Sequence, residues 1–263
     1  MNNSKKKYSP PSSKKESKVY GVHAVKAVFK NRPQDIIKLI LTKERAAAFS
    51  ELLSYMAKHK KAYHLESSDT ISQYANSLHH EGVCLLTKDA PPLKLKDVFN
   101  HLKNNKPILL LALENIDNPH NLGAIIRTAS HFAVDAIFYS SKNTYHSDAA
   151  VARVAQGGVE YVPLVKVFEW SELIDFCSQK KISIFTTSDR ASKAVSLDTF
   201  LEKSLIVYGN EGEGISNFWK KITTTHIKIH GTNKVESLNI SVANGILLSF
   251  YRQKFHLPLT STH

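Results

Sequence analysis

Cysteine is nearly absent from this chain, with only Cys84 and Cys177 in 263 residues. Each lies in an apolar setting, so we expect two buried free thiols rather than a disulfide or a metal-binding pair. A chain without disulfides fits a reducing compartment, and we predict a cytoplasmic location. The run His79-His80-Glu81-Gly82-Val83 lacks the second histidine of a His-Glu-x-x-His zinc motif, so we expect no metal site.

Long apolar runs are also missing. No stretch approaches the roughly 20 consecutive apolar residues that a membrane-spanning helix needs, so we expect no membrane partner. The N-terminus lacks the apolar core of a secretory signal. Residues 1–17 consist mainly of Lys, Ser and Pro, which predicts a disordered basic tail whose part in RNA binding stays open. Residues 258–263 are expected to form a second tail.

Acidic residues are outnumbered, because 35 Lys and Arg face 23 Asp and Glu and the formal net charge is +12. The first 18 residues hold six Lys and one Glu, which leaves +7 for the rest of the chain. A basic folded body favours a polyanionic partner, most simply nucleic acid. A charge that serves only solubility is the alternative.

Residues 18–88 alternate between helix and strand patterns, which predicts a small α/β domain with helices around a sheet. The expected helices are Val22–Lys30, Lys43–Lys60 and Asp69–Leu78, the last with Asp69 as its N-cap, and the expected strands are Ile36–Thr42, Ala62–Leu65 and Val83–Thr87. Residues 89–105 contain a Pro-Pro pair and several Lys, so we expect a linker with one short helix.

Residues 106–257 show a stronger α/β pattern, and the stretch Ile108–Leu113 is apolar throughout, as in a strand buried on both faces. The further expected strands are Ala136–Tyr139, Val162–Val167, Ile182–Thr187, Leu205–Tyr208 and Ile227–Ile229. The expected helices are Pro119–Phe132, Ser147–Ala155, Glu169–Gln179, Ile215–Lys221 and Glu236–Phe255. This alternation predicts a mostly parallel sheet with helices on both faces.

The first motif runs from Asn118 to Arg127 and follows Glu114 at the end of the buried strand. Asn121 and Arg127 are six residues apart, whereas side chains on one helical face lie three or four apart. We therefore place Asn121 at the loop-to-helix junction, while Gly123 allows another segment to approach the helix closely. The planar guanidinium of Arg127 suits a phosphate. A helix cap and an ordinary surface arginine are the alternative.

The second motif is the run Gly209-Asn210-Glu211-Gly212-Glu213-Gly214. It matches neither the dinucleotide-binding fingerprint nor the P-loop, which argues against a nucleotide-binding oxidoreductase. It also places two acids where a phosphate would lie at such a loop. The loop instead suits a cationic or zwitterionic ligand held by backbone groups. An ordinary glycine-rich turn is the alternative.

The third motif opens the last predicted helix, Glu236–Phe255, with Ser237 as the expected N-cap. Ser237 and Asn239 are expected to face a site. Ser241 and Asn244 are expected to satisfy backbone groups inside a tight core, because buried polar groups need partners. Helix capping combined with helix–helix hydrogen bonding is the alternative.

The three motifs together, NPHNLGAIIR, IVYGNEGEGIS and VESLNISVA, resemble the SpoU family, the TrmH-type RNA ribose 2′-O-methyltransferases of the SPOUT superfamily. The resemblance covers Lys106–Phe255. The stretches VYGVHAVKAVF and HHEGV make Val19–Lys88 similar to the RNA substrate-binding domain of the longer members, which resembles ribosomal protein L30e. The resemblance implies a C-terminal domain with a trefoil knot, a pocket for S-adenosylmethionine, and a homodimer with the last helix in its interface.

The family's functional residues carry over to positions in all three motifs. The cofactor positions are Gly209, Ile229 and Leu238, with Asn210 and Gly214 in the same loop as Gly209. Arg127 matches the residue proposed to help deprotonate the ribose 2′-OH, and its supporting polar cluster is Asn121, Glu211, Ser237 and Asn239. The pKa of arginine, above about 12, makes it a poor free base. Arg127 is therefore expected to act with an RNA phosphate or to stabilise the alkoxide.

The resemblance thus implies an S-adenosylmethionine-dependent methyltransferase that acts on a ribose 2′-OH of rRNA or tRNA, with rRNA favoured by the two-domain build. A catalytically inactive RNA-binding protein that keeps the fold is the alternative. The presence of Arg127, Glu211, Ser237 and Asn239 argues against that alternative.

Overall fold

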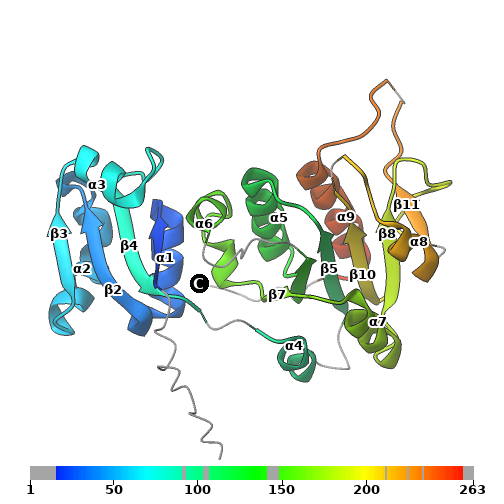
Figure 1. Ribbon diagram of the computed structural model, residues 1–263, viewed down its shortest axis with the longest axis horizontal. Coiled ribbons are helices and arrows are strands. Elements are labelled where there is room, and N and C mark those ends of the chain that lie inside the picture. Colours follow the sequence, from blue (N-terminus) through cyan, green and yellow to red (C-terminus); the bar gives the residue numbers. More distant parts are fainter. Residues whose placement is uncertain are drawn as a thin grey trace, which may run out of the picture.

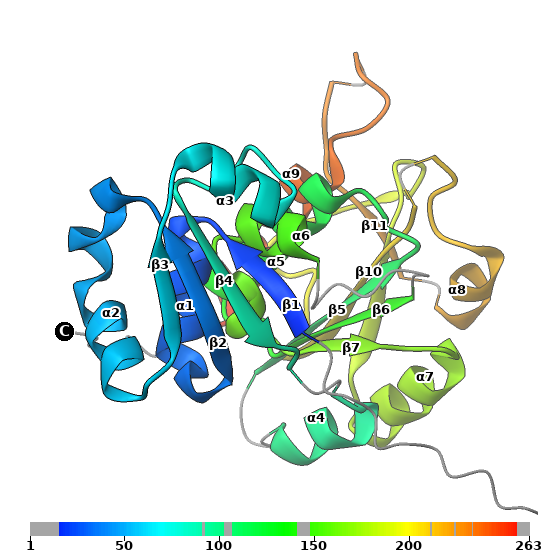
Figure 2. The ribbon, with the colours of Figure 1, turned by 60° about the vertical axis from the view of Figure 1, so that its left-hand side comes forward.

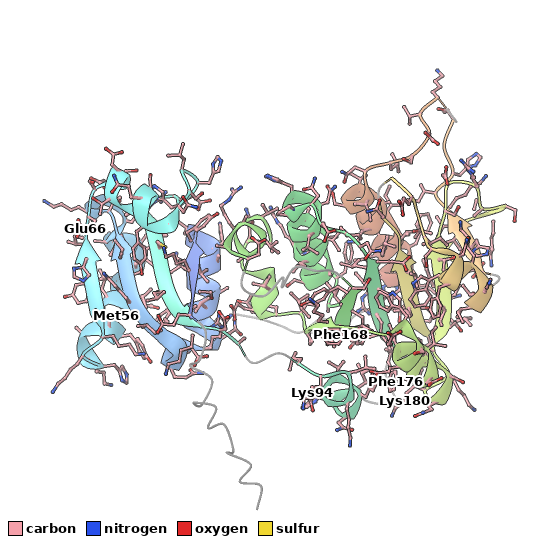
Figure 3. The ribbon with its side chains drawn as sticks, in the orientation of Figure 1. Met56, Glu66, Lys94, Phe168, Phe176 and Lys180 are labelled. Atoms are coloured by element: carbon pink, nitrogen blue, oxygen red, sulfur yellow. The ribbon has the colours of Figure 1, made fainter. Side chains whose placement is uncertain are left out.

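The computed structural model describes residues 16–90, 93–102, 107–140, 148–210, 212–223, 225–232 and 234–256. They form two α/β domains that lie side by side along the long axis of the molecule (Figure 1). Met56 lies in the core of the first domain and Phe176 in the core of the second (Figure 3). Residues 1–15 and 258–263, the bulk of the two predicted tails, lie outside the described residues. Within the described ranges, no helix is long and apolar enough to cross a membrane.

The N-terminal domain is built on a four-stranded sheet in the order β1-β4-β2-β3. The strands are β1 (Glu16–Tyr20), β2 (Ile36–Leu41), β3 (Ala62–Leu65) and β4 (Val83–Lys88). β4 pairs antiparallel with β1 and β2, and β3 lies parallel to β2. Helices α1 (Val22–Asn31) and α2 (Ser50–Lys58) pack on one face and α3 (Ser68–Ala75) on the other (Figure 2). The predicted sandwich of helices around a sheet is confirmed.

Strand β1 was not predicted, and several boundaries in this domain differ from the sequence prediction. Glu16 and Ser17, expected in the tail, belong to β1 and pair with β4. The N-cap of α3 is Ser67 rather than Asp69, because the Ser67 hydroxyl accepts a hydrogen bond from the Thr70 backbone N–H. That helix ends at Ala75, since the next residue adopts the left-handed conformation.

The predicted helix Lys43–Lys60 begins later than expected. Two 3-10 turns, η2 (Lys43–Arg45) and η3 (Ala47–Phe49), precede α2. The α-helix begins only at Ser50, from which point Leu52 and Met56 are buried one turn apart. The predicted linker contains α4 (Leu95–His101), whose Val98 packs into the core of the second domain.

The C-terminal domain is built on a seven-stranded sheet in the order β7-β6-β5-β10-β8-β11-β9. The strands are β5 (Ile108–Glu114), β6 (Ala136–Ser140), β7 (Leu164–Lys166), β8 (Ser183–Thr187), β9 (Lys193–Ala194), β10 (Lys203–Tyr208) and β11 (His226–Lys228). All of the strand pairs described are parallel. Every residue of β5 is buried, which confirms the prediction of a strand covered on both faces.

Helices cover both faces of this sheet. Helices α5 (Pro119–His131), α6 (Ala149–Val154) and α9 (Ile240–Lys254) lie with one core, and α4, α7 (Trp170–Gln179) and α8 (Asn217–Ile222) lie with the other. Alternate residues of β5 supply the two cores, so Leu109 and Leu111 face α5 while Leu110 and Ala112 face α7. The predicted α/β class with a mostly parallel sheet is confirmed.

The order of the strands reverses next to β5. From β5 the chain builds outward through β6 and β7, whereas β10, β8 and β11 lie on the opposite side of β5. Ligands of open parallel sheets bind outside the carboxyl ends of the strands at such a reversal. The topology therefore predicts a ligand site at the loops that follow β5 and β10.

Candidate active site at the carboxyl ends of β5 and β10

The loop after β10 is a tight turn that only glycine can begin. We call residues 209–214 the glycine loop; Glu211 lies outside the described residues. A Cβ atom added to Gly209 would lie 2.1 Å from the backbone carbonyl carbon of Gly214 and 2.2 Å from the backbone nitrogen of Ile215. The Gly214 N–H donates to the Asn210 carbonyl at 2.8 Å, and Gly214 has a φ of 69°. The loop therefore folds back on its own first residue.

The side chain of Asn210 fixes the glycine loop from within. Its Oδ1 accepts hydrogen bonds from the Gly212 N–H at 2.8 Å and the Glu213 N–H at 3.3 Å. Its Nδ2 donates to the Asn115 carbonyl at 2.9 Å, directly after β5. Asn210, predicted to bind the cofactor, thus shapes the loop and ties it to the neighbouring strand.

Glu114, at the end of β5, also anchors the end of the glycine loop. Its carboxylate is buried, and the two oxygens accept hydrogen bonds from the Ser216 N–H and the Ser216 hydroxyl, both at 2.8 Å. Ser216 is the N-cap residue of α8, so the carboxylate holds the chain where the glycine loop leads into that helix. The sequence prediction included no role for Glu114. The sequence feature that could have revealed this role is a single acid at the end of an otherwise apolar strand.

A second polar contact joins the first turns of α5 and α9. Asn239 is the N-cap of α9, with its Oδ1 accepting from the Ser241 N–H at 2.9 Å and the Ser241 hydroxyl at 2.6 Å. Its Nδ2 donates to Asn121 Oδ1 at 2.9 Å. Asn121 lies in the first turn of α5, as predicted. The helix begins at Ile240 rather than Glu236, so Asn239 and not Ser237 is the N-cap.

Arg127 lies further along α5, with its side chain exposed. Among the described residues, no hydrogen bond or ion pair engages its guanidinium. The predicted role of Gly123 nearby is confirmed, because an added Cβ there would lie 2.6 Å from Val154 Cβ on α6. Helix α6 therefore packs directly on α5, while Arg127 faces solvent.

The segment between β11 and α9, of which residues 229–232 and 234–239 are described, extends outward from the body of the domain (Figure 1). Ile229 at its start packs, partly buried, on the core beneath α5 and α9. Ser237 and Leu238 near its end are exposed, Leu238 by 44%. Among the described residues no hydrogen bond joins this segment to the glycine loop. The structure thus places Gly209, Asn210 and Gly214 together and links Asn121 to Asn239, and no contact of Ser237 or Leu238 with the loop is found among the described residues.

Asn244 contradicts its predicted role. Its side chain is fully buried, yet neither its Oδ1 nor its Nδ2 has a hydrogen-bond partner. Among the described residues, the amide therefore satisfies no backbone group. Ser241 also differs from prediction, since its hydroxyl bonds to a side chain, that of Asn239.

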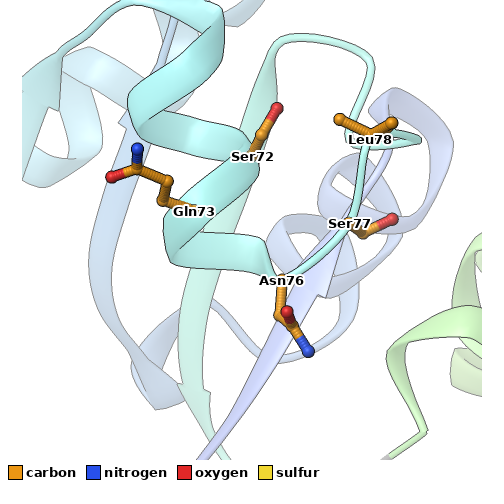
Figure 4. Close-up of a pocket in the computed structure, with 5 residues that line it drawn as sticks. All are labelled: Ser72, Gln73, Asn76, Ser77 and Leu78. Carbon is orange, nitrogen blue, oxygen red and sulfur yellow. The ribbon is translucent and has the colours of Figure 1, made fainter.

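Two cavities are described, and neither is lined by a predicted site residue. One, of about 340 Å³, lies at the end of α3 and is lined by Ser72, Gln73, Asn76, Ser77 and Leu78 (Figure 4). The other, of about 510 Å³, lies between the domains and is lined by Glu16, Ser17, Lys18, Ala75, Asn76, Asp89 and Ala149. Both are remote in sequence from the glycine loop, so the candidate site is defined by its loops and polar contacts.

The two cysteines are free and buried, as predicted. Burial raises the pKa of Cys84 to about 11 and the pKa of Cys177 to about 12, so both thiols stay protonated at neutral pH. Within the part of the chain that the structure describes, no group of three or more His, Cys, Asp and Glu could hold a metal ion.

Both domains match models of known protein families. A model of the SpoU rRNA Methylase family matches residues 108–249, and a model for RNA 2'-O ribose methyltransferase substrate binding matches residues 18–93. An uncharacterized tRNA/rRNA methyltransferase, YfiF of Escherichia coli O157:H7, is 33% identical over 90% of this chain and 68% of its own length. The 23S rRNA (guanosine-2'-O-)-methyltransferase RlmB of Shewanella oneidensis is 30% identical over 89% of this chain and 96% of its own length.

Solved structures agree on the fold. The crystal structure of an RNA 2'-O ribose methyltransferase superimposes with a TM-score of 0.75 at 19% identity, covering 93% of this chain and 90% of that one. The SpoU methyltransferase AviRb from Streptomyces viridochromogenes, solved in complex with AdoMet, gives 0.73 at 19% identity over 92% and 91%. The family model, which spans more than half of the sequence, and the relatives matched over nearly all of it lead to one conclusion. This chain belongs to the SpoU rRNA methylase family.

Proposed function

We propose that this chain transfers a methyl group from S-adenosylmethionine to a ribose 2′-OH of RNA. The observation that carries the proposal is the arrangement at the carboxyl ends of β5 and β10. The glycine loop follows β10, the Asn121–Asn239 hydrogen bond joins the first turns of α5 and α9, and no described residue engages the guanidinium of Arg127, all in a chain of the SpoU family. Full-length relatives named as 23S rRNA methyltransferases favour rRNA as the substrate over tRNA. Nothing observed favours the inactive alternative.

The residues present fit S-adenosylmethionine. The glycine loop carries Glu211 and Glu213 and contains no Lys or Arg, which suits a cationic sulfonium rather than an anion. Gly209 and Gly214 leave the backbone of the loop free of side-chain bulk. Backbone groups of Gly209, Ile229 and Leu238 would hold the cofactor, which supplies an electrophilic methyl group when bound.

The chain's own residues would position the nucleophile. Arg127, exposed on α5, would hold the RNA through a phosphate or stabilise the developing 2′-alkoxide by its positive charge. The Asn121–Asn239 hydrogen bond would keep the first turn of α5 in register with α9. Alignment of the 2′-oxygen with the methyl group and removal of its proton would supply most of the rate enhancement.

Incubation of the chain with methyl-labelled S-adenosylmethionine and unmodified RNA tests the proposal. We expect label in rRNA, recovered as nuclease-resistant 2′-O-methyl nucleotides. Arg127→Lys should lower the single-turnover rate on the order of 100-fold, because lysine cannot reproduce the planar fork. The affinity for S-adenosylmethionine should not change. Label found in tRNA alone would show that the substrate is tRNA and not rRNA. A full rate in Arg127→Lys would refute the role of the arginine.

We further propose a homodimer with α9 in its interface and a knotted path for residues 205–255. Leu238 and Val242, exposed by 44% and 50% near the start of α9, support an interface there. Two free thiols support a cytoplasmic location. Sedimentation equilibrium tests the dimer, and Val242→Glu should shift it toward the monomer if α9 forms the interface.

A further inference from the structure

The segment between α6 and β7 contacts both domains. We call residues 157–160, which include the 3-10 turn η5 (Gly158–Glu160), the bridge segment. A Cβ atom added to Gly157 would lie 2.4 Å from Ala27 Cβ on α1 of the N-terminal domain. A Cβ atom added to Gly158 would lie 3.3 Å from the Cα atom of Arg127 on α5. Two consecutive glycines thus pack against the substrate-binding domain and against the backbone of Arg127.

The end of the bridge segment is held by an ion pair between the domains. Arg32 Nε donates to Glu160 Oε2 at 2.8 Å and Arg32 Nη2 donates to Glu160 Oε1 at 2.9 Å. Arg32 Nη1 also donates to Thr87 Oγ1 at 3.0 Å and to the Lys88 carbonyl at 2.7 Å. The two charged side chains are only 12% and 10% exposed. A bidentate pair of this kind fixes orientation as well as distance.

Further contacts make the docking extensive. Ala149 of α6 packs on the N-terminal core formed by Tyr20, Ile71 and Cys84. Helix α6 lies between α1 and α5 (Figure 1), so the two domains meet through α6 and the bridge segment. The N-terminal domain is therefore docked on the catalytic domain and not only joined to it by the linker.

We propose that docking of the substrate-binding domain positions Arg127. The bridge segment would transmit the orientation of α1 to the backbone of α5, so that RNA held by the N-terminal domain meets Arg127 in one fixed geometry. Arg32, Gly157, Gly158 and Glu160 are positioning residues in this account, which rests on the proposed role of Arg127. A buried ion pair often contributes little net stability, so we assign this pair a positioning role.

The first test compares Arg32→Ala with Lys30→Ala. Both variants remove one positive charge from the same region of the N-terminal domain, but Lys30 is exposed and does not contact Glu160. We expect Arg32→Ala to lower the single-turnover methylation rate at saturating unmodified rRNA by about tenfold or more, since small misplacements are costly in such reactions. Affinity for S-adenosylmethionine should be unchanged, and Lys30→Ala should keep the full rate. Equal rates in the two variants would overturn the proposal.

A second variant and a structural readout separate positioning from folding. Glu160→Gln keeps the shape of the side chain on the other domain and should reproduce the loss of rate. Gly158→Ala should lower the rate without weakening RNA binding, because its Cβ would press on the Arg127 backbone. Hydrogen exchange of residues 122–131, measured without RNA, should become faster in Arg32→Ala. A lower melting temperature with unchanged exchange in α5 and an unchanged rate would assign the pair a structural role only.

Arg127→Lys, measured in parallel, distinguishes the two proposals. If Arg127→Lys keeps the full rate, the catalytic proposal fails. Faster hydrogen exchange of α5 in Arg32→Ala would then still show that the N-terminal domain is coupled to the backbone of α5. If Arg127→Lys is slow while Arg32→Ala is not, the catalytic proposal stands and positioning by the N-terminal domain is refuted.

Discussion

The two loops expected to hold the cofactor are built in opposite ways. The glycine loop is fixed entirely by the protein, through the Asn210 amide, the Glu114–Ser216 contact and the close approach of Gly209 to Gly214. Residues 230–232 and 234–238 extend away from the body of the domain (Figure 1), and a described side-chain anchor follows at Asn239, where α9 begins. One half of the proposed site is therefore held in shape by the protein's own contacts, whereas the other half exposes apolar surface such as Leu238.

From this difference we infer that the two loops contribute to cofactor binding in different ways. A preformed loop lowers the entropic cost of binding, because its backbone is already ordered. An exposed segment that closes over a ligand adds contacts only when that ligand is present, so it couples cofactor binding to completion of the site. We therefore expect mutations in the glycine loop to affect stability and binding together, and mutations in residues 230–238 to affect binding alone.

The largest effect is expected from Gly209→Ala. The new Cβ would lie 2.1 Å from the backbone of Gly214, so the loop must open, with a cost of about 3 kcal/mol or more in the free energy of unfolding. Binding of S-adenosylmethionine should be lost as well. The matched control is Gly231→Ala in the exposed segment, where an added Cβ meets no atom within 4 Å. Chemical denaturation and cofactor titration of both variants compare the two loops. Equal losses in Gly209→Ala and Gly231→Ala would contradict the difference between them.

Glu114→Gln should come next. The neutral amide would weaken two hydrogen bonds to Ser216 and leave a poorly matched polar group in a buried position, at a cost of about 2 kcal/mol. Ser216→Ala removes only the hydroxyl partner and should cost less. Urea denaturation checks both values. A Glu114→Gln variant as stable as the parent chain would mean that the carboxylate does not hold the junction.

Asn239→Ala should have a smaller effect, because it removes one helix cap and one side-chain contact. Loss of an N-cap costs about 1 kcal/mol. Asn239→Ser keeps a capping hydroxyl but is too short to reach Asn121, so it should recover most of the stability and little of the activity. Thermal unfolding and methylation rate, measured side by side, check this split. Equal recovery of both would mean that the contact with Asn121 has no catalytic value.

Leu238→Ser should have the smallest effect on stability, within about 0.5 kcal/mol, because the side chain is 44% exposed and a surface substitution removes little packing. The affinity for S-adenosylmethionine should nevertheless fall, if the segment closes on the cofactor. Isothermal titration calorimetry measures it. Unchanged affinity would leave the second half of the proposed pocket without support.

Much of the fold could be predicted because its strands are short, apolar and well separated. The unbroken apolar run of β5 predicted a strand buried on both faces, and the motif that follows it predicted helix α5. The short strand β9 was missed, since Lys193 and Ala194 carry no alternating pattern. Strand β1 was not predicted, because Glu16 and Ser17 continue a polar tail and only pairing with β4 makes the segment a strand.

The site was predictable where a motif is local and not where partners are distant. Placing Asn121 at the start of α5 required only the six-residue spacing to Arg127. The contacts of Glu114 with Ser216 and of Arg32 with Glu160 join residues 102 and 128 positions apart, which no local pattern reveals. Choosing Ser237 over Asn239 as the cap failed because both are capping residues, and tertiary contact with Asn121 decided between them.

The most direct test follows backbone hydrogen exchange as S-adenosylmethionine is added to the full chain. We expect strong new protection in residues 229–239 and a smaller gain in the glycine loop, which is already hydrogen-bonded. Cofactor that binds without protecting residues 229–239, or that protects a distant surface instead, would contradict a pocket formed between these two loops.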